Sequence, residues 1–596
     1  MSTASIVARV CAVYGRIVRK VPPLSSGAVA RVQDLIQRGA QLYGDRPFVL
    51  RHEPHGWAGL SFVESARAVR AFARLLADHG VTAGARIAIQ AENRPEWGLA
   101  YLGALDAGAV LVPLDLQLTP EETGEILATA EVTHAIVSRR SRAVMEAARR
   151  ARRPALALVT LDDEPDLPSW PEAVRRFPDA GALPLTGEAE EVAVVLFTSG
   201  TTGAAKGVML THTNLLSNVE TVANTLEFGA ADRFLSVLPL HHTFEFMGGF
   251  LCPLRVGASV AYARGLKSGE LREDIASSGA TILLGVPLLH EKFIEGLHRG
   301  IDHAPLPRRW TARALMAASR AIRLTTGRRV GHALLRSLRA SAGLGSLRLL
   351  VSGAAALATE VFWEFVDLGI PLIEGYGLTE CSPVVAANHP PRPKAGAVGW
   401  PLPGVDVRIE DPDDEGNGEV LVRGPNVMKG YFHDPGRTAE VLQDGWFRTG
   451  DLGKLLSDGR LKITGRLKTM IATAAGKKVY PEEVETRLAR SPFVVEVVVV
   501  GGRGAHAERE EVHAHVFPNQ ERLEGLARAQ GHPIDAAFVE STIRREVDML
   551  SQALAPYKRP RRVIVRRVPF PRTATGKIVR QAAIDEEARR GEERSA

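Results

Sequence analysis

The chain is poor in cysteine and lacks long uncharged apolar runs. Its three cysteines, Cys11, Cys252 and Cys381, lie far apart in 596 residues, which excludes a disulfide framework and a closely spaced cysteine metal site. The apolar stretch 98–112 is shorter than the about 18 residues that span a bilayer, and it contains Asp106. The N-terminus shows no apolar core followed by a small-residue cleavage site. We therefore expect a cytoplasmic protein in a reducing compartment.

Acidic residues are absent between residues 303 and 359, where ten arginines occur. Because a helix that carries only positive charge attracts anions, we expect this stretch to meet membrane phosphates or a phosphorylated cofactor; a solvated helical face is the alternative. Residues 6–21 are also basic, and they are predicted either to lie on a membrane surface or to pack on their own domain. Peripheral association with the inner face of a membrane is thus left open. The net charge of +6 is too small to indicate nucleic acid.

Strands and helices alternate along most of the chain. Hydrophobic residues make up 45% and charged residues 24%, as in ordinary globular enzymes, and the length suffices for several domains. The alternation before and after residue 200 predicts an α/β fold with two similar layers built on parallel sheets. Short strands after Pro401 predict a small β-barrel. The predicted parts are an N-terminal extension at 1–34, a large domain at 35–466 with the barrel at about 400–466, a smaller mobile α+β lid domain at 467–582 and a charged tail at 583–596.

Hydroxyl groups and glycines are concentrated in the segment LFTSGTTGAAKG. Its residues with phosphate-binding chemistry are Thr198, Ser199, Gly200, Thr201, Thr202, Gly203 and Lys206. Glycine lets the backbone approach a ligand closely, and exposed N–H and hydroxyl groups donate to phosphate oxygens. The Walker loop does not fit, because two alanines separate Gly203 from Lys206 and Gly207 stands where that loop needs a hydroxyl. The segment therefore predicts a phosphate loop of another kind.

This loop, with the THTN that follows it, resembles the signature loop of the adenylate-forming enzymes. That superfamily includes acyl-CoA synthetases, adenylation domains and firefly-type luciferases. Ala205 stands where the family usually has proline, which removes a stiff turn but no chemical group. Further motifs match in family order, so the resemblance extends over about residues 35–582.

Two of these motifs carry nucleotide and metal contacts. IEGYGLTEC resembles the adenine and metal segment, and it places Tyr376, Gly377 and Thr379 at ATP. Within it Glu380 resembles the magnesium ligand, a hard oxygen donor. LVSGAAAL resembles the backbone segment that lies against adenine, which implies contacts from Gly353 and Ala354.

The other motifs imply ribose, hinge and catalytic residues. In GWFRTGDLG and GRLKTMI, Asp451 and Arg466 resemble the two ribose contacts, and Lys468 stands at the family's domain hinge. PRTATGKIVR supplies Lys577, which resembles the catalytic lysine that bridges the carboxylate and the α-phosphate. In PLHHTFEF, His242 resembles the histidine at the acyl pocket. The implied catalytic set is therefore Lys577, Glu380, Thr379 and His242.

The resemblance implies that a carboxylic acid is activated with ATP and Mg²⁺ and is then passed to the thiol of coenzyme A. SVLPLHHTFEF and TILLGVPLLHEKF look most like long-chain fatty acyl-CoA synthetases. The basic cluster at 558–562 is a candidate for the coenzyme A phosphates, with plain solvation as the alternative. An acyl–acyl carrier protein ligase and a nonenzymatic fatty-acid or nucleotide-binding scaffold are the rival hypotheses. No insertion occurs between Asp451 and Pro481, which favours coenzyme A, and a homodimer is left open.

Overall fold

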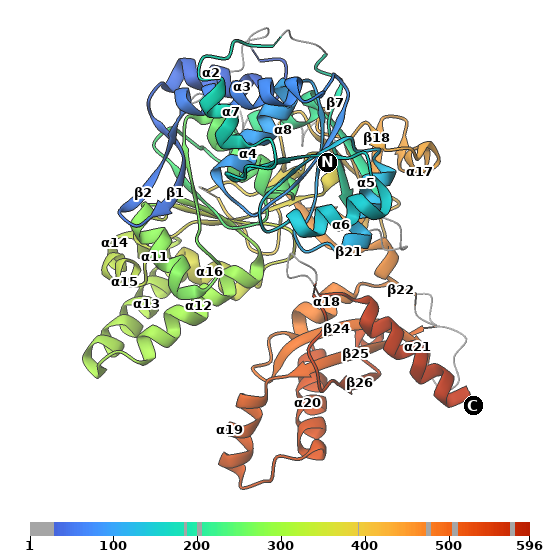
Figure 1. Ribbon diagram of the computed structural model, residues 1–596. Helices are drawn as coiled ribbons and strands as arrows, with labels where there is room; N and C mark the ends of the chain where they lie inside the picture. The colour runs from blue at the N-terminus through green and yellow to red at the C-terminus, as the bar shows by residue number, and fades with distance from the viewer. Residues whose placement is uncertain are drawn as a thin grey trace. The chain divides into compact units, whose positions relative to one another are not determined.

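The computed structural model describes residues 29–183, 188–198, 206–390, 392–472, 478–503, 510–572 and 578–595. The chain divides into two compact units (Figure 1). The first comprises Met1–Val407, Val422–Phe447 and Ser457–Leu461, and the second comprises Arg408–Leu421, Arg448–Leu456 and Lys462–Ala596. Both units contain strands and helices, which confirms the predicted α/β fold class. The predicted domain boundaries stay a prediction.

The first unit contains a sheet of seven strands in the order β18–β8–β7–β4–β3–β5–β6. The strands are β3 (Arg86–Gln90), β4 (Val110–Pro113), β5 (His134–Val137), β6 (Ala157–Thr160), β7 (Val192–Thr198), β8 (Lys206–Thr211) and β18 (Gly430–Tyr431). From β7 to β6 the neighbours run parallel, whereas β8 and β18 join one edge in antiparallel pairing. The first of the two predicted layers is thereby confirmed.

A second sheet of the first unit has nine strands in the order β15–β14–β13–β12–β11–β9–β10–β1–β2. The strands are β1 (Pro47–Glu53), β2 (Gly56–Ser61), β9 (Arg233–Ser236), β10 (Ser259–Tyr262), β11 (Ile282–Gly285), β12 (Leu349–Ser352), β13 (Leu372–Gly377), β14 (Val384–Ala387) and β15 (Trp400–Pro401). The neighbours from β13 to β1 run parallel, and β2, β14 and β15 are antiparallel at the two ends. The sequence did not predict the β1–β2 hairpin, which belongs to this second layer although it precedes all strands of the first.

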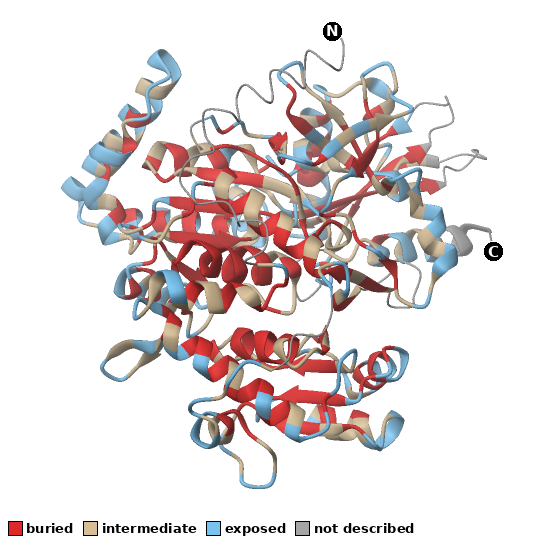
Figure 2. Ribbon diagram, turned by 90° about the horizontal axis from the view of Figure 1, so that it is seen from above, coloured by how far each residue is buried: buried red, intermediate tan, exposed pale blue. Residues whose placement is uncertain are grey.

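Helices cover these sheets, and most strand residues are buried beneath them (Figure 2). The longer helices before residue 230 are α2 (Asp34–Tyr43), α3 (Phe62–Asp78), α4 (Pro95–Asp106), α5 (Pro120–Thr129), α6 (Arg142–Arg152), α7 (Trp170–Arg176) and α8 (His212–Thr225). The predicted helix that ends near Gly80 is α3. It begins with a capping box in which Ser61 and Glu64 satisfy each other's backbone N–H groups, and Gly80 follows it with φ of 87°.

The second half of the first unit adds a further helical layer. Its helices are α9 (Thr243–Glu245), a π-helix η1 (Phe246–Leu251), α10 (Cys252–Val256), α11 (Ser268–Ser278), α12 (Pro287–Asp302), α13 (Leu306–Thr326), α14 (Gly331–Leu334), α15 (Arg336–Ser341), α16 (Thr359–Leu368), the 3-10 turn η2 (Thr379–Cys381) and α17 (Pro435–Val441). α13 packs on α12, α14 and α16. Their apolar side chains form one core cluster with the second sheet, in which Phe362 and Phe365 of α16 are fully buried.

A small sheet occupies the segment that was predicted as a β-barrel. Its order is β16–β17–β20–β19 with β21 also on β20, and the strands are β16 (Asp406–Glu410), β17 (Gly418–Arg423), β19 (Leu442–Gln443), β20 (Trp446–Leu455) and β21 (Leu461–Arg466). The second unit adds β22 (Ile471–Ala472) paired with β23 (Lys478–Val479), and a sheet of β24 (Val494–Arg503), β25 (Glu510–Pro518) and β26 (Arg562–Val565). Its helices are η3 (Leu467–Thr469), α18 (Pro481–Leu488), α19 (Gln520–Gln530), α20 (Ala536–Ser551), η4 (Pro556–Lys558) and α21 (Gln581–Ser595).

The predicted charged tail is helical in α21, and a buried ion-pair cluster holds it. His513 and His515 on β25 are buried, and each has a ring nitrogen within about 3 Å of the Glu587 carboxylate. Burial raises the pKa of Glu587, but its contacts with the two histidines outweigh this and hold the pKa well below the ordinary value. Across the described part of the chain, no helix combines the length and the apolarity that crossing a bilayer requires.

Candidate active site

The carboxyl ends of neighbouring parallel strands bring predicted residues together in the first unit. Ser352 at the end of β12 pairs with Glu374 of β13, so Gly353 and Tyr376 follow at the same edge of the nine-stranded sheet. His242 comes after β9, which lies two strands from β12 in the same sheet. A Cβ added to Gly353 would lie 3.0 Å from the Phe244 ring, which shows that the segment carrying His242 packs directly against the segment carrying Gly353.

The turn after β13 is closed so tightly that it requires glycine. A Cβ on Gly377 would lie 1.8 Å from the backbone oxygen of Pro383, and the Leu378 N–H donates to that same oxygen at 2.9 Å. The turn between these contacts contains Thr379 and Glu380 as part of η2. Gly377 was predicted as an ATP contact, and the structure gives it the additional task of shaping this turn.

Two buried asparagines fix the same turn from outside. The Asn426 side-chain amide donates to the backbone oxygens of Cys381 and Val384, and the Asn218 amide also donates to Val384. Both asparagines are almost fully buried, so breaking these bonds would leave unpaired amides in the interior. The turn that carries Glu380 is therefore held by neighbours on two other segments.

Glu380 is joined to Lys206 through Tyr431. The Tyr431 hydroxyl donates to Glu380 Oε1 at 3.0 Å, and the Lys206 ammonium lies 5.1 Å from the centre of the Tyr431 ring. Burial and the Glu380 charge raise the pKa of Tyr431 above its ordinary value, so the phenol remains a donor at neutral pH. Lys206 and Glu380, which are 174 positions apart, thus both contact the Tyr431 side chain.

Lys206 also marks one end of the predicted phosphate loop. Thr198, the last residue of β7, pairs with Lys206, the first residue of β8, so the two strands leave the loop from adjacent positions. Ser199, Gly200, Thr201, Thr202 and Gly203 lie outside the described residues. The THTN that follows has a local structural explanation, because Thr211 and Asn214 form the capping box that starts α8.

The histidine pair lies against a carboxylate of the other sheet. His241 Nε2 is 3.5 Å from Asp115 Oδ2, and the rings of His241 and His242 are 4.2 Å apart between centres. Burial raises the pKa of Asp115, but His241 and the Gln117 N–H lower it further than burial raises it. Asp115 follows β4 of the seven-stranded sheet, so the two sheets meet at this pair.

Asn93 joins the same loop to the seven-stranded sheet. Its side-chain amide donates to the Ser236 hydroxyl at 3.2 Å and to the Leu238 oxygen at 2.6 Å. Its side-chain oxygen accepts from the Leu240 N–H at 3.0 Å. Asn93 thereby holds the segment that leads from β9 to His242.

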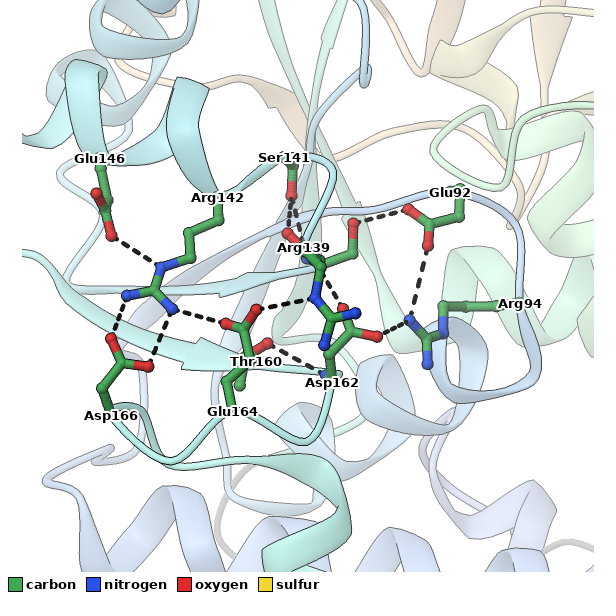
Figure 3. Close-up of polar contacts among 11 residues, drawn as sticks. Glu92, Arg94, Arg139, Ser141, Arg142, Glu146, Thr160, Asp162, Glu164 and Asp166 are labelled. Atoms are coloured by element: carbon green, nitrogen blue, oxygen red, sulfur yellow. Dashed lines mark hydrogen bonds and ion pairs between the residues drawn. The ribbon is translucent and has the colours of Figure 1, made fainter.

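A network of ion pairs supports Asn93 from the carboxyl edge of β3, β5 and β6 (Figure 3). Arg94 lies 2.8 Å from Asp162, and Arg142 lies 2.7 Å from Glu164. The residues labelled in Figure 3 are Glu92, Arg94, Arg139, Ser141, Arg142, Glu146, Thr160, Asp162, Glu164 and Asp166. Because these charges pair with one another, we assign this network to holding the loops after the three strands.

A buried carboxyl group lies behind the histidine loop. Glu245 in α9 is 1% exposed. Burial raises its pKa to about 8, although the Ser236 hydroxyl and the N–H groups of Val237 and Leu238 offset part of that rise. Glu245 is therefore mostly protonated at neutral pH, and it precedes the fully buried π-helix η1.

The predicted ribose contacts lie in the second unit. Asp451 on β20 is buried, and the Arg466 guanidinium, at the end of β21, lies 2.9 Å from its carboxylate. The two predicted ribose contacts therefore lie side by side, and their binding to ribose stays a prediction. Lys468 follows in η3 with an exposed side chain, and Lys577 lies outside the described residues.

The predicted use of the basic cluster at 558–562 is wrong for Lys558. Its side chain is buried in the second unit and lies 2.8 Å from Glu483. Burial lowers the pKa of Lys558, but Glu483 raises it further, so the net direction is upward. The Arg559 guanidinium donates to the backbone oxygens of Leu554 and Gln552. Neither side chain extends freely toward a phosphate.

Family models match both parts of the chain. The model of the AMP-binding enzyme matches residues 36–432, and that of the AMP-binding enzyme C-terminal domain matches residues 483–577. The chain belongs to the AMP-binding enzyme family. This confirms the resemblance to adenylate-forming enzymes, and more specifically the protein is an acid–thiol ligase of that family.

Known relatives of this AMP-binding enzyme act on different acids. It is 32% identical over 510 residues to long-chain-fatty-acid–CoA ligase 6 of Rattus norvegicus, which covers 78% of this chain and 71% of that protein. It is 31% identical over 459 residues to feruloyl-CoA synthase of an Amycolatopsis species, covering 75% and 81%. Among solved structures, ATP-bound MatB from Rhodopseudomonas palustris superposes with a TM-score of 0.73 at 28% identity, covering 93% and 98%.

Sequence reasoning missed four residues of this AMP-binding enzyme that position the site: Asn93, Asp115, Glu245 and Tyr431. Tyr431 and Glu380 are 51 positions apart, and Asn93 contacts residues more than 140 positions away. Glu245 offered the only signal, because a carboxylate stood within the apolar stretch TFEFMGGF. The other three are ordinary residues until the fold brings their partners close.

The first prediction concerns the turn after β13. Gly377→Ala places a methyl group against the Pro383 oxygen at 1.8 Å, whereas Gly375→Ala meets only Ala386 O at 3.4 Å. We expect G377A to weaken AMP binding by at least about tenfold and G375A to stay within about twofold of the wild type. Isothermal titration with AMP measures both. Equal affinities for the two variants would contradict the assigned role of the turn.

The second prediction concerns Glu245. Its folded pKa of about 8 exceeds the unfolded value near 4.3, so the folded state keeps a proton that the unfolded state loses. As pH rises from the unfolded pKa to the folded pKa, the free energy of unfolding of the wild type should therefore fall by about 1 kcal/mol per pH unit relative to that of E245Q. Urea unfolding across that pH range measures the difference. The exposed substitution E125Q is the control, and a pH-independent difference between E245Q and the wild type would refute the prediction.

Proposed function

We propose that this enzyme activates a long-chain fatty acid with ATP to an acyl adenylate and transfers the acyl group to coenzyme A. The observation that carries the proposal is the arrangement of Lys206, Tyr431 and Glu380 at the mouth of the phosphate loop. A cation and a carboxylate held on one aromatic ring suit the phosphates of a nucleotide and their metal ion. The similarity to long-chain-fatty-acid–CoA ligase 6 supports a long-chain fatty acid as the substrate.

In the first half-reaction the substrate carboxylate attacks the α-phosphate of ATP, and the bond to pyrophosphate breaks. We assign the β- and γ-phosphates to the loop from Thr198 to Lys206. Lys577 balances the negative charge that builds between the carboxylate and the α-phosphate. Thr379 donates to the α-phosphate, and Tyr376, Gly353 and Ala354 form the adenine site. Asp451 and Arg466 are assigned to the ribose hydroxyls.

The metal site fits magnesium. Among the described residues no group of three histidine, cysteine or acidic side chains is placed to bind a metal by itself. Magnesium needs no such group, because it uses one or two carboxylates together with substrate phosphates. Glu380 is half-buried, and Tyr431 fixes one of its oxygens. When bound, Mg²⁺ would neutralise phosphate charge beside Glu380.

In the second half-reaction the coenzyme A thiol attacks the acyl carbonyl, and AMP leaves with the electron pair of the broken acyl–phosphate bond. We assign Lys468 to the hinge, since this exposed residue lies in η3, directly after β21. The chain passes from β21 to β22 within a few residues, without an added segment. This favours free coenzyme A over a carrier protein as the acceptor.

The acyl site is assigned to His242 and the apolar residues after it. His242 leads into α9 and η1, where Phe246 and Phe250 are buried. π-helical turns often occur at functional sites. The feruloyl-CoA synthase relative makes a hydroxycinnamic acid the second candidate substrate.

A substrate panel tests the proposal. Fatty acids from acetate to arachidate and ferulate are each incubated with the enzyme, ATP, Mg²⁺ and coenzyme A, and AMP release is measured. We expect kcat/KM to be at least about a hundredfold higher for palmitate than for acetate or ferulate, since each buried methylene adds to binding. Preference for ferulate would replace the substrate class, and product only with holo carrier protein would replace the acceptor. No pyrophosphate release with any acid would support a nonenzymatic scaffold.

The role of Lys577 has a separate test. K577A should lower adenylate formation by at least about a thousandfold, because it removes the charge that offsets the developing oxyanion. Thioester formation from preformed acyl adenylate should remain within about threefold of the wild type. The exposed substitution K267A is the control. Equal losses in the two half-reactions would contradict the assignment.

A further inference from the structure

Few residues of the long helix α13 are buried. Of its 21 residues only Ser319 is fully buried, and Ala312, Leu315 and Met316 are the ones that pack on the core cluster. These four lie three to four positions apart and so form one face of the helix. α13 therefore rests on α12, α14 and α16 through one narrow face (Figure 1).

The opposite face exposes large apolar side chains. Leu306, Trp310 and Leu324 are 68%, 71% and 65% exposed, and they recur at helical spacing on the side away from Ser319. Ala317 lies between them and is also exposed. At 1.5 Å per residue this apolar line extends over about 27 Å. A tryptophan and two leucines this exposed on one helix indicate a face that meets something other than water.

Positive charge flanks this apolar line. α13 contains no acidic residue. Arg320 lies four positions before Leu324 and therefore beside it on the helix; among the described residues it has no ion-pair partner, and it is exposed. The acidic groups beside the helix are already paired: Asp302 lies 2.6 Å from Arg313, and Asp367 pairs with Arg323.

We propose that the outward face of α13 (Leu306, Trp310, Arg320 and Leu324) binds an anionic lipid surface, with the helix axis parallel to it. Tryptophan and leucine insert at the boundary of headgroups and acyl chains, and arginine pairs with lipid phosphates. A second copy of the chain fits poorly, because joining two such faces would bring arginines together. The proposal does not depend on the substrate of the enzyme.

Vesicle cosedimentation of the full chain without substrates tests this proposal. We expect binding to phosphatidylcholine vesicles that contain about one third phosphatidylglycerol, weaker binding to phosphatidylcholine alone, and loss of binding at high salt. R320Q should weaken binding to the anionic vesicles by about fivefold or more. The matched control is R544Q, which removes one exposed arginine elsewhere.

The apolar contribution is tested by W310A and L324A. Both should weaken vesicle binding by at least about threefold, because each removes buried apolar area at the interface. L266A is the control, since Leu266 is also 65% exposed but lies outside α13. Thermal unfolding should be unchanged in all these surface variants.

Three outcomes would overturn the proposal. The first is absence of binding to anionic vesicles. The second is full binding by R320Q and W310A, which would place the contact elsewhere in the chain, for example in residues 6–21. The third is a dimer that W310A converts to a monomer while vesicle binding stays the same, which would make this face an interface between copies.

Discussion

The close approach of the end of β13 to Pro383 constrains the edge of the nine-stranded sheet to which the nucleotide is assigned. Because Gly377 leaves no room for a side chain, the chain turns back at once and presents Thr379 and Glu380 at the sheet edge. Asn218, Asn426 and Tyr431 then hold that turn from α8, from the segment before β18 and from β18 itself. If the turn opened, Glu380 would lose its partner and Lys206 would no longer share a ring with it.

The histidine side of the first unit depends on a different kind of contact. Parallel strands end at one edge, and there Asn93 and Asp115 of one sheet reach the loop after β9 of the other. The ion pairs around Arg94 and Arg142 keep the loops of the seven-stranded sheet in place (Figure 3). Glu245 adds a carboxyl group that burial keeps mostly protonated, so it supports the loop without placing a full charge in the interior.

Charge is used differently at the surface of α13. Arg313 and Arg323 form ion pairs with Asp302 and Asp367, and these ion pairs attach α13 to its neighbours. Arg320 remains at the surface beside Leu324. The arginines that were predicted to meet anions therefore have two roles. Some form ion pairs within the protein, and others remain available to lipid.

The sequence by itself determined the fold class, the parallel strands and the family, because hydrophobic periodicity and contiguous motifs are local properties of the chain. It also singled out Asp451 and Arg466, which the structure then places in contact. Only the tertiary structure decided that Tyr431 joins Lys206 to Glu380, that Asn93 and Asp115 hold the histidine loop, and that Lys558 is buried against Glu483. These contacts join residues tens to hundreds of positions apart, and burial and hydrogen-bond partners at such separations arise only when the sheets have assembled.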